Sequence, residues 1–313
     1  MSAILESHPQ RALSHSAYVE LTVHFRCNLK CQHCMILDSM HWLTPADDAD
    51  FQALLDENLS EQKWKGLILT GAEVTLRPDL PRMAERARNA GFEHVRIQTH
   101  GMRLDNPDYC RTLVDAGIDE FFISVTADTA QQHDLITEVP GSFVRTMNGI
   151  QNLDEIPGIS ILTNTVVTRM SYNRLSSVVE RLRHVRNLRR MEFWCYWPMA
   201  EEAKPELIVS HLEVVPHLRQ AVRLARVFGR DVEVKNFPHC LLGSESSALI
   251  NDQPELRIDP RFWNEFHRNG FHQCLYRDRC ASKQCLGLNT AYTKVYGWHP
   301  DELKPMRPEA PKS

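Results

Sequence analysis

Short apolar segments alternate with longer amphipathic segments along the first two hundred residues of the chain. Apolar runs rich in β-branched residues predict strands, and segments with apolar positions three or four residues apart predict helices. We expect strands at 18–26, 65–71, 94–99, 121–125, 159–167 and 191–197. We expect helices at 45–59, 79–89, 106–116, 142–153 and 174–185.

This alternation predicts an α/β fold with a parallel sheet and right-handed crossovers, in which ligands gather at the carboxyl ends of the strands. Six strand–helix units predict a partial (β/α)6 TIM-like barrel. A helix at 206–227 and a short strand at 231–234 follow, and no further clear unit. We therefore expect a polar N-terminal arm over 1–17, the barrel over 18–227 and a small cysteine-rich domain over 228–313.

Composition narrows the class of protein. The chain is 42% hydrophobic and 24% charged, which is typical of globular proteins, and its net charge of -4 gives no general attraction to nucleic acid. It has no apolar run long enough to span a membrane, and residues 1–16 lack the apolar core of a signal peptide. We expect a cytoplasmic protein without nucleic-acid or membrane partners. The arginine-rich run 181–190 is expected to solvate a helix end and the following turn.

Nine cysteines in a cytoplasmic chain favour metal or redox chemistry over disulfides. Cys110 and Cys195 stand alone and are interpreted as small buried hydrophobes. The others form two groups: Cys27, Cys31 and Cys34 directly after the first strand, and Cys240, Cys274, Cys280 and Cys285 near the C-terminus. Three thiolates can hold a metal centre with one coordination position left open, although short cysteine clusters also bind zinc.

The first cysteine group, in its context, resembles the signature of the radical SAM superfamily. The segment Cys-Asn-Leu-Lys-Cys-Gln-His-Cys over 27–34 is a common form of that motif. Three further segments are similar to family motifs, in order: Gly-Ala-Glu-Val over 71–74, Gln-Thr-His-Gly over 98–101, and Ile-Ser-Val-Thr-Ala-Asp over 123–128. The resemblance covers about residues 18–200.

The resemblance implies a [4Fe-4S] cluster on the three clustered thiolates, with S-adenosylmethionine (SAM) chelating the fourth iron. Family members cleave SAM with one electron and abstract hydrogen from a substrate with the resulting 5'-deoxyadenosyl radical. The implied cofactor-binding residues in this chain are Gly71, Ala72, Glu73, Ser124, His33, Thr99, Asn164 and Arg169. Glu73 is expected to hold its loop rather than to take part in chemistry, and His33 to pack beside the adenine.

Three positions depart from the family pattern. Ala72 replaces a glycine and Val74 a proline in the turn after the second strand. Thr137 stands where an arginine commonly meets the SAM carboxylate, and Arg169 is a candidate replacement or, alternatively, a solvated surface residue. No motif identifies a catalytic residue.

The four C-terminal cysteines resemble the twitch domain, a shortened relative of the SPASM domain. This resemblance implies one auxiliary [4Fe-4S] cluster with four protein ligands, suited to outer-sphere electron transfer. Zinc, or four unconnected cysteines, are the alternatives.

Three functional hypotheses follow. The first is a radical SAM enzyme that oxidises or rearranges a small molecule, supplied with electrons by a flavodoxin or ferredoxin. The second is a maturase of a peptide or protein side chain, less favoured because only about 17 residues precede the first strand. The third is a zinc-stabilised binding protein without catalytic activity. The aromatic segment 193–197 could stack on a substrate.

Overall fold

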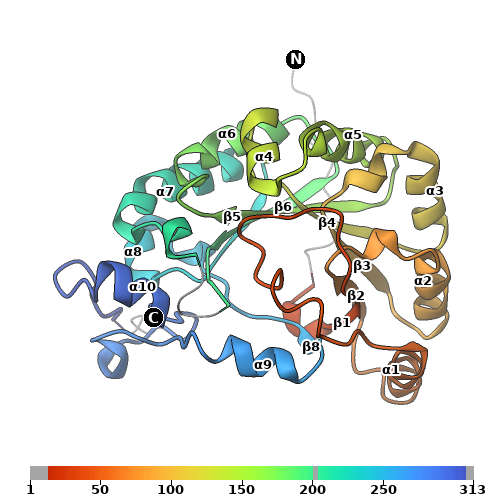
Figure 1. The fold of residues 1–313 in the computed structure, drawn as a ribbon, viewed down its shortest axis with the longest axis horizontal. Helices are drawn as coiled ribbons and strands as arrows, with labels where there is room; N and C mark the ends of the chain where they lie inside the picture. The colour runs from red at the N-terminus through yellow and green to blue at the C-terminus, as the bar shows by residue number, and fades with distance from the viewer. Residues whose placement is uncertain (1–12, 200–203, 308–313) are drawn as a thin grey trace, which may run out of the picture.

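The fold is a single curled sheet of eight parallel strands with helices on its outer face (Figure 1). The computed structural model describes residues 13–199 and 204–307. The strand order is β7-β6-β5-β4-β3-β2-β1-β8. The strands are β1 Tyr18–His24, β2 Gly66–Gly71, β3 His94–Thr99, β4 Glu120–Ser124, β5 Ser160–Val167, β6 Leu188–Cys195, β7 Asp231–Lys235 and β8 Glu255–Arg257.

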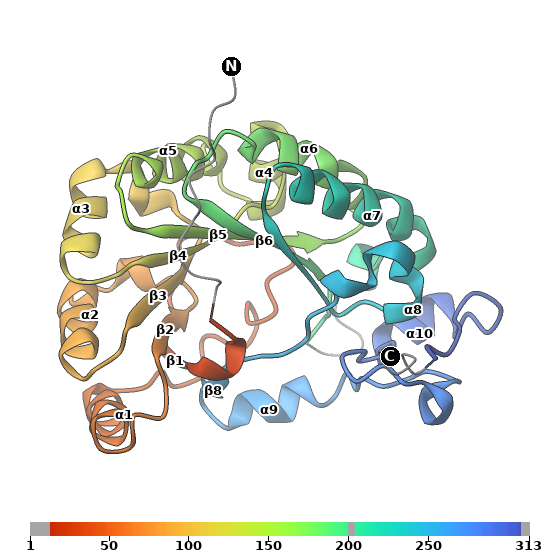
Figure 2. The same cartoon turned by 180° about the vertical axis from the view of Figure 1, so that it is seen from behind.

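Most helices follow the strands and cover the convex side of the sheet, whereas the short helix Arg261–Phe266 lies at its open side, as both views show (Figures 1 and 2). The sheet ends at β7 on one side and β8 on the other, so the barrel is partial. The helices are α1 Asp48–Glu61, α2 Leu80–Asn89, α3 Pro107–Asp115, α4 Ala130–Thr137, α5 Ser142–Asp154, α6 Leu175–Leu182, α7 His211–Val227, α8 His239–Leu242, α9 Arg261–Phe266 and α10 Thr290–Tyr296.

Side-chain alternation along the strands separates the core from the concave face. On β1, Val19, Leu21 and Val23 are buried in the main core under the helices, with exposed fractions of 0–3%. Glu20, between them, faces the other way and stays partly exposed. The same alternation recurs on the neighbouring strands, so the apolar core lies outside the sheet and a polar surface lies inside it.

The α/β partial barrel is confirmed, and its strand count is corrected. Two edge strands extend the six barrel strands: β7, which was predicted at 231–234, and β8, which was not predicted. It has three residues, Glu255–Arg257, without an apolar run, and it forms because it pairs in parallel with the free edge of β1. The division at residue 227 remains a prediction, although β7 and β8 after it hydrogen-bond to the barrel.

Two further expectations differ from the structure. Arg190, expected in a solvated turn, lies on β6 with 6% of its surface exposed and pairs with Glu233 at 2.8 Å. The predicted N-terminal arm lies outside the described residues up to residue 12, but residues 15–17 form a short 3-10 helix. There His15 contacts Glu233 at 2.8 Å. Cys110 and Cys195 are buried, as expected.

A second, smaller hydrophobic cluster joins the cysteine loop to the segment after β8. Its buried members are Phe25, Leu43, Met199 and Phe262. The backbone N–H of Thr44 also donates to the Asp259 carboxylate at 2.8 Å. The C-terminal segment therefore packs against the loop that carries the first three cysteines. No helix among the described residues combines the length and apolar content needed to cross a bilayer.

Candidate active site at the carboxyl edge of the sheet

The loop after β1 carries Cys27, Cys31 and Cys34 to the carboxyl edge of the sheet. All three side chains are half-buried. The Leu29 N–H donates to the Cys27 sulfur at 3.3 Å, and the Cys34 N–H to the Cys31 carbonyl at 3.0 Å. Burial raises the pKa of the Cys27 thiol to about 11 and also raises the pKa values of the other two. Metal binding would therefore have to displace protons from these thiols.

Helix α4, which the sequence did not predict, supports this loop from one side. The last carbonyls of a helix have no partner within the helix. Here the Ile136 carbonyl accepts from the Gln32 N–H at 2.9 Å, and the Thr137 carbonyl from the Lys30 N–H at 3.1 Å. The Thr137 hydroxyl is buried against Ser142 Oγ at 2.7 Å. Thr137 thus helps to fix the loop, at the position for which the family resemblance suggested an arginine.

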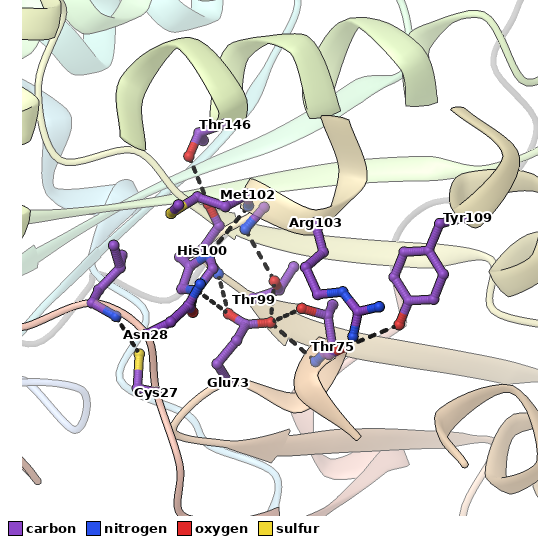
Figure 3. Close-up of polar contacts among 12 residues, drawn as sticks. Cys27, Asn28, Glu73, Thr75, Thr99, His100, Met102, Arg103, Tyr109 and Thr146 are labelled. Atoms are coloured by element: carbon purple, nitrogen blue, oxygen red, sulfur yellow. Dashed lines mark hydrogen bonds and ion pairs between the residues drawn. The ribbon is translucent and has the colours of Figure 1, made fainter. Parts of the chain in front are cut away.

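The opposite side of the loop is fixed by the fully buried carboxylate of Glu73, which follows β2 (Figure 3). One oxygen accepts from the Thr75 N–H at 3.0 Å, the Thr75 hydroxyl at 2.5 Å and the Thr99 hydroxyl at 2.7 Å. The other accepts from the His100 N–H at 2.9 Å. Both oxygens are occupied, which supports the expectation that Glu73 holds the loop.

His100 connects this carboxylate to the cysteine loop. Its Nδ1 accepts from the Met102 N–H at 3.1 Å, so its proton lies on Nε2. Nε2 is 2.7 Å from Asn28 Oδ1 and 3.2 Å from the Glu73 carboxylate. Burial lowers the pKa of His100, so it acts as a neutral donor. Asn28 adjoins Cys27, and the chain Glu73–His100–Asn28 ends at the first cysteine.

The glycine at the end of β2 lies in close contact with strand β1. A side-chain carbon at Gly71 would lie 2.1 Å from the His24 carbonyl oxygen, so a larger residue would collide with the backbone of β1. The β1–β2 register shifts here, between Thr22 and His24. The Ala72 N–H donates to the same His24 carbonyl at 2.8 Å.

The remaining predicted cofactor contacts fall into two groups. Ser124 and Asn164 lie opposite each other on β4 and β5, both partly exposed on the concave face, and Asn164 Oδ1 is buried without a hydrogen-bond partner. Thr99 is buried with its hydroxyl on Glu73. Arg169 is exposed on the outside, where it contacts Tyr296 and pairs with Glu213 at 3.5 Å.

His33 lies in the cysteine loop, half-buried. Its pKa is lowered to about 4, first by burial and then by the nearby His133 and Lys204. Lys204 Nζ donates to the Gln32 carbonyl at 2.5 Å. His33 is thus a neutral ring beside Cys34.

Comparison with known families agrees with this arrangement. The family model of the radical SAM superfamily matches residues 21–185, just over half of the chain. This chain belongs to the radical SAM superfamily. Membership makes it an enzyme and implies SAM and a [4Fe-4S] cluster as its cofactors.

Similar proteins within the superfamily differ in what they do. The chain is 25% identical over 240 residues to Fe-coproporphyrin III synthase of Methanosarcina barkeri, covering 74% of this chain and 58% of that protein. It is 25% identical over 211 residues to a probable GTP 3',8-cyclase of Methanococcus maripaludis, covering 67% and 68%. The chain therefore spans little more than half the length of the first relative.

Among solved structures, Streptococcus suis SuiB bound to its precursor peptide SuiA has a TM-score of 0.59 at 15% identity. That match covers 82% of this chain and 55% of SuiB. It shows that the radical SAM fold is shared.

The four C-terminal cysteines of this radical SAM chain come together in the fold. The pKa of Cys240 is raised by burial and further by the nearby Cys285, Cys274 and Cys280 thiols. Backbone N–H groups surround the sulfurs: His239 and Gly287 donate to Cys285 at 3.5 and 3.3 Å. Met306 donates to Cys280 at 3.3 Å. Such bonds to sulfur are a general feature of protein-bound iron–sulfur clusters.

The thiols can be compared with the spacing that a single zinc ion requires. Zinc with Zn–S bonds of roughly 2.3 Å in a tetrahedron would hold its sulfurs roughly 3.8 Å apart. Within residues 13–199 and 204–307, the ligand atoms of one group of three His, Cys, Asp or Glu side chains lie within 4.8 Å of one another. That group is His15, Glu192 and Glu233. In neither set of cysteines do three sulfur atoms lie this close to one another. The described cysteines are therefore not arranged as closely as a bound zinc ion would hold them.

The sequence missed Asn28 and His100 as parts of the site. Both residues lie within segments that resemble family motifs, 27–34 and 98–101, and this was the available signal. That signal did not show that the two residues bond to each other, because Asn28 and His100 are 72 positions apart in the sequence.

Proposed function

We propose that this radical SAM enzyme binds its SAM-cleaving [4Fe-4S] cluster through Cys27, Cys31 and Cys34 and acts on a small-molecule substrate. The observation that carries the proposal is the position of these thiols at the carboxyl edge of β1, on a loop held by α4 and by the Glu73–His100–Asn28 chain. When bound, the cluster and SAM supply one-electron cleavage of the sulfonium and hydrogen abstraction from the substrate.

The protein's contribution is to fix positions before the reaction. The loop is held through backbone groups and buried side chains, so the thiols are pre-organised for the cluster. Asn164 Oδ1, buried without a partner, and the neighbouring Ser124 would offer hydrogen bonds to SAM. The carbonyls of Gly71 and Ala72 remain the candidate acceptors for its amino group. Arg169 is engaged on the outer face, which weakens its candidacy for the SAM carboxylate.

We infer an auxiliary [4Fe-4S] cluster on Cys240, Cys274, Cys280 and Cys285. The gathering of the four thiols and the backbone donors to Cys280 and Cys285 support it. Four protein ligands leave no iron open for substrate, so this cluster would transfer electrons. A flavodoxin or ferredoxin is the expected electron donor.

The small-molecule substrate is favoured over a peptide by the relatives found through sequence. Their names describe action on a tetrapyrrole and on GTP. A peptide substrate is the second candidate, favoured by the likeness of the fold to a structure that binds a precursor peptide.

The test of the first cluster is formation of 5'-deoxyadenosine by anaerobically reconstituted protein with SAM and dithionite. Cys27→Ala should reduce it to background, because only two thiols would remain for the cluster. Cys110→Ala is the matched control, a buried cysteine that donates to the Leu104 carbonyl, and should keep most of the activity. Undiminished 5'-deoxyadenosine from Cys27→Ala would overturn the assignment.

The auxiliary cluster is tested by metal analysis of the same preparations. Two clusters give about eight irons per chain, and replacing Cys27, Cys31 and Cys34 together should leave about four. If the wild-type protein held one zinc ion per chain and Cys274→Ala lost it, the C-terminal cysteines would form a structural zinc site instead of an auxiliary cluster. If the wild-type protein held only about four irons per chain and no zinc, the C-terminal cysteines would bind no metal.

A further inference from the structure

The C-terminal cysteine group lies near the surface of the molecule. In both views the dark blue C-terminal segment is at the edge of the molecule, outside the sheet and beside α10 (Figures 1 and 2). Cys280 is partly exposed, and its chain neighbours Arg279 and Ala281 are exposed. A cluster bound to this cysteine would therefore lie close to any protein that contacts this surface.

Two segments of the chain meet at Cys280. The Met306 N–H donates to the Cys280 sulfur at 3.3 Å, and the Ala281 N–H donates to the Met306 carbonyl at 3.0 Å. These two bonds hold the tail 304–307 against the loop 277–283. We define the exposed surface of these two segments as the cationic face.

The cationic face carries more positive than negative charge. Its one exposed acid is Asp278, and its exposed cations are Arg277, Arg279, Lys283, Lys304 and Arg307. Among the described residues, no carboxylate lies within ion-pair distance of these five cations. The acids Asp301 and Glu302 precede the tail, where Glu302 lies 3.9 Å from His299. The face therefore keeps uncompensated positive charge in a chain whose net charge is -4.

Apolar side chains are exposed beside the same face. Leu275 is 54% exposed and Trp298 is 41% exposed. The segments that carry them are joined by the Tyr276 hydroxyl, which donates to the Pro300 carbonyl at 2.6 Å. Arg279 also lies over the Tyr276 ring, 5.5 Å from its centroid. Protein interfaces combine apolar and aromatic contacts with a polar rim, so this composition suits a protein partner better than a small anion.

We propose that the cationic face is the docking surface for an acidic one-electron carrier protein that supplies electrons to the auxiliary cluster. The net charge of the whole chain repels an acidic protein, so the complementary charge of this face would guide the carrier to the cluster. In the transfer, the reduced carrier loses one electron and the oxidised cluster gains it, and no bond or proton changes place. The inference rests on the proposed function, because it assumes the auxiliary cluster.

The first test measures binding, with an acidic flavodoxin as the probe. Calorimetry with the anaerobically reconstituted chain should show binding that weakens at least about ten-fold between about 20 and 200 mM salt, because salt screens exposed charges. No binding, or binding that is independent of salt, would overturn the proposal. A DNA or RNA oligonucleotide that bound more tightly than flavodoxin at the same salt would assign the face to nucleic acid instead.

Matched double variants, each of which removes two positive charges, locate the docking surface. Arg277→Gln with Arg279→Gln should weaken flavodoxin binding at least about five-fold at low salt. Arg82→Gln with Arg111→Gln, at exposed positions of α2 and α3, is the control for net charge and should change the affinity less than about two-fold. Equal effects of the two variants would show a general effect of charge and no docking surface.

A third double variant tests the other cysteine group. Arg26 and Lys30 are exposed cations on either side of Cys27. Arg26→Gln with Lys30→Gln should leave flavodoxin binding within about two-fold of wild type. If this variant weakened binding and the variant of the cationic face did not, the carrier would dock at the first cysteine group and the proposal would be wrong.

The second test measures electron transfer to the auxiliary cluster alone. In the chain with Cys27, Cys31 and Cys34 replaced, stopped-flow absorbance follows reduction of the remaining cluster by reduced flavodoxin. Arg277→Gln with Arg279→Gln should slow this reaction at least about five-fold, while reduction by photoreduced 5-deazariboflavin, a small molecule, changes less than about two-fold. If both reductants slowed equally and the reduction potential of the cluster fell, the cations would tune the cluster rather than bind a carrier.

Failure of this inference differs from failure of the proposed function. If the chain with Cys27, Cys31 and Cys34 replaced held no iron, there would be no auxiliary cluster, and that part of the proposed function would fail together with this inference. If that chain held about four irons and Arg277→Gln with Arg279→Gln left flavodoxin binding unchanged, only the docking surface would fail.

Discussion

Replacing Glu73 with glutamine tests whether the buried carboxylate holds the site together. The amide keeps the shape but turns one acceptor into a donor. The least costly orientation directs the amide nitrogen at His100, because the other oxygen serves three donors from Thr75 and Thr99. The His100 N–H, 2.9 Å away, then loses its acceptor in a fully buried position.

The expected cost follows from these contacts. A buried N–H without an acceptor costs about 1–3 kcal/mol, and the remaining bonds lose the extra strength of a charged acceptor. We therefore expect the free energy of unfolding to fall by about 2–4 kcal/mol. The assay is urea unfolding followed by circular dichroism, in which the midpoint falls while the slope stays constant.

The control is Glu85→Gln, an exposed change that should alter the free energy of unfolding by less than about 0.5 kcal/mol. If Glu73→Gln were as stable as Glu85→Gln, the carboxylate would not hold the turn after β2, and its hydrogen bonds would be incidental. A role in chemistry would then have to be considered for Glu73 instead.

Three further outcomes follow from the structure. Gly71→Ala should lower the free energy of unfolding by about 1–3 kcal/mol, because its methyl group meets strand β1 backbone, whereas Ala72→Gly should cost less than about 1 kcal/mol; equal urea midpoints would contradict this. The pKa of Glu20 is raised from 4.5 to about 7, so the folded chain binds more protons than the unfolded chain between these values and loses stability as the pH rises through them. Glu20→Gln should therefore be the more stable protein at pH 8, by up to about 3 kcal/mol, and no more stable than wild type at pH 4. Burial lowers the pKa of His211 from 6.5 in the unfolded chain to about 3 in the folded chain. Below pH 6.5 the unfolded chain therefore binds a proton that the folded chain does not bind, and the free energy of unfolding falls as the pH drops. His211→Phe should flatten that acid limb in urea unfolding measured as a function of pH.

Local periodicity predicted most of the scaffold. All seven expected strands and six expected helices exist, with ends displaced by a few residues, because their apolar faces are fixed by burial against the sheet. The missed helix α4 has the sequence Ala-Gln-Gln-His-Asp-Leu-Ile-Thr, whose polar residues hide its short apolar stripe. A signal was present in Thr129, which caps the helix by accepting from the Gln132 N–H at 3.4 Å.

Other features have no local signal. Arg190 looks like part of a solvated basic run, yet it lies on β6 because Glu233 on the next strand neutralises it. The His100–Asn28 bond joins distant segments, and no pattern within either segment specifies it. The clustering of the cysteines was predicted by their spacing, whereas the groups that hold them in place became visible only in three dimensions.

The pairing of β8 with β1 has a consequence for synthesis of the chain on the ribosome. Strand β8 begins at Glu255, 231 positions after β1 ends at His24. At about 5–20 residues per second, the open edge of β1 would wait roughly 12–46 seconds for its partner. During that time an unpaired row of backbone groups is exposed to other chains, which is the condition for aggregation. The nascent barrel would therefore depend on a chaperone or on rapid translation until its last strand emerges.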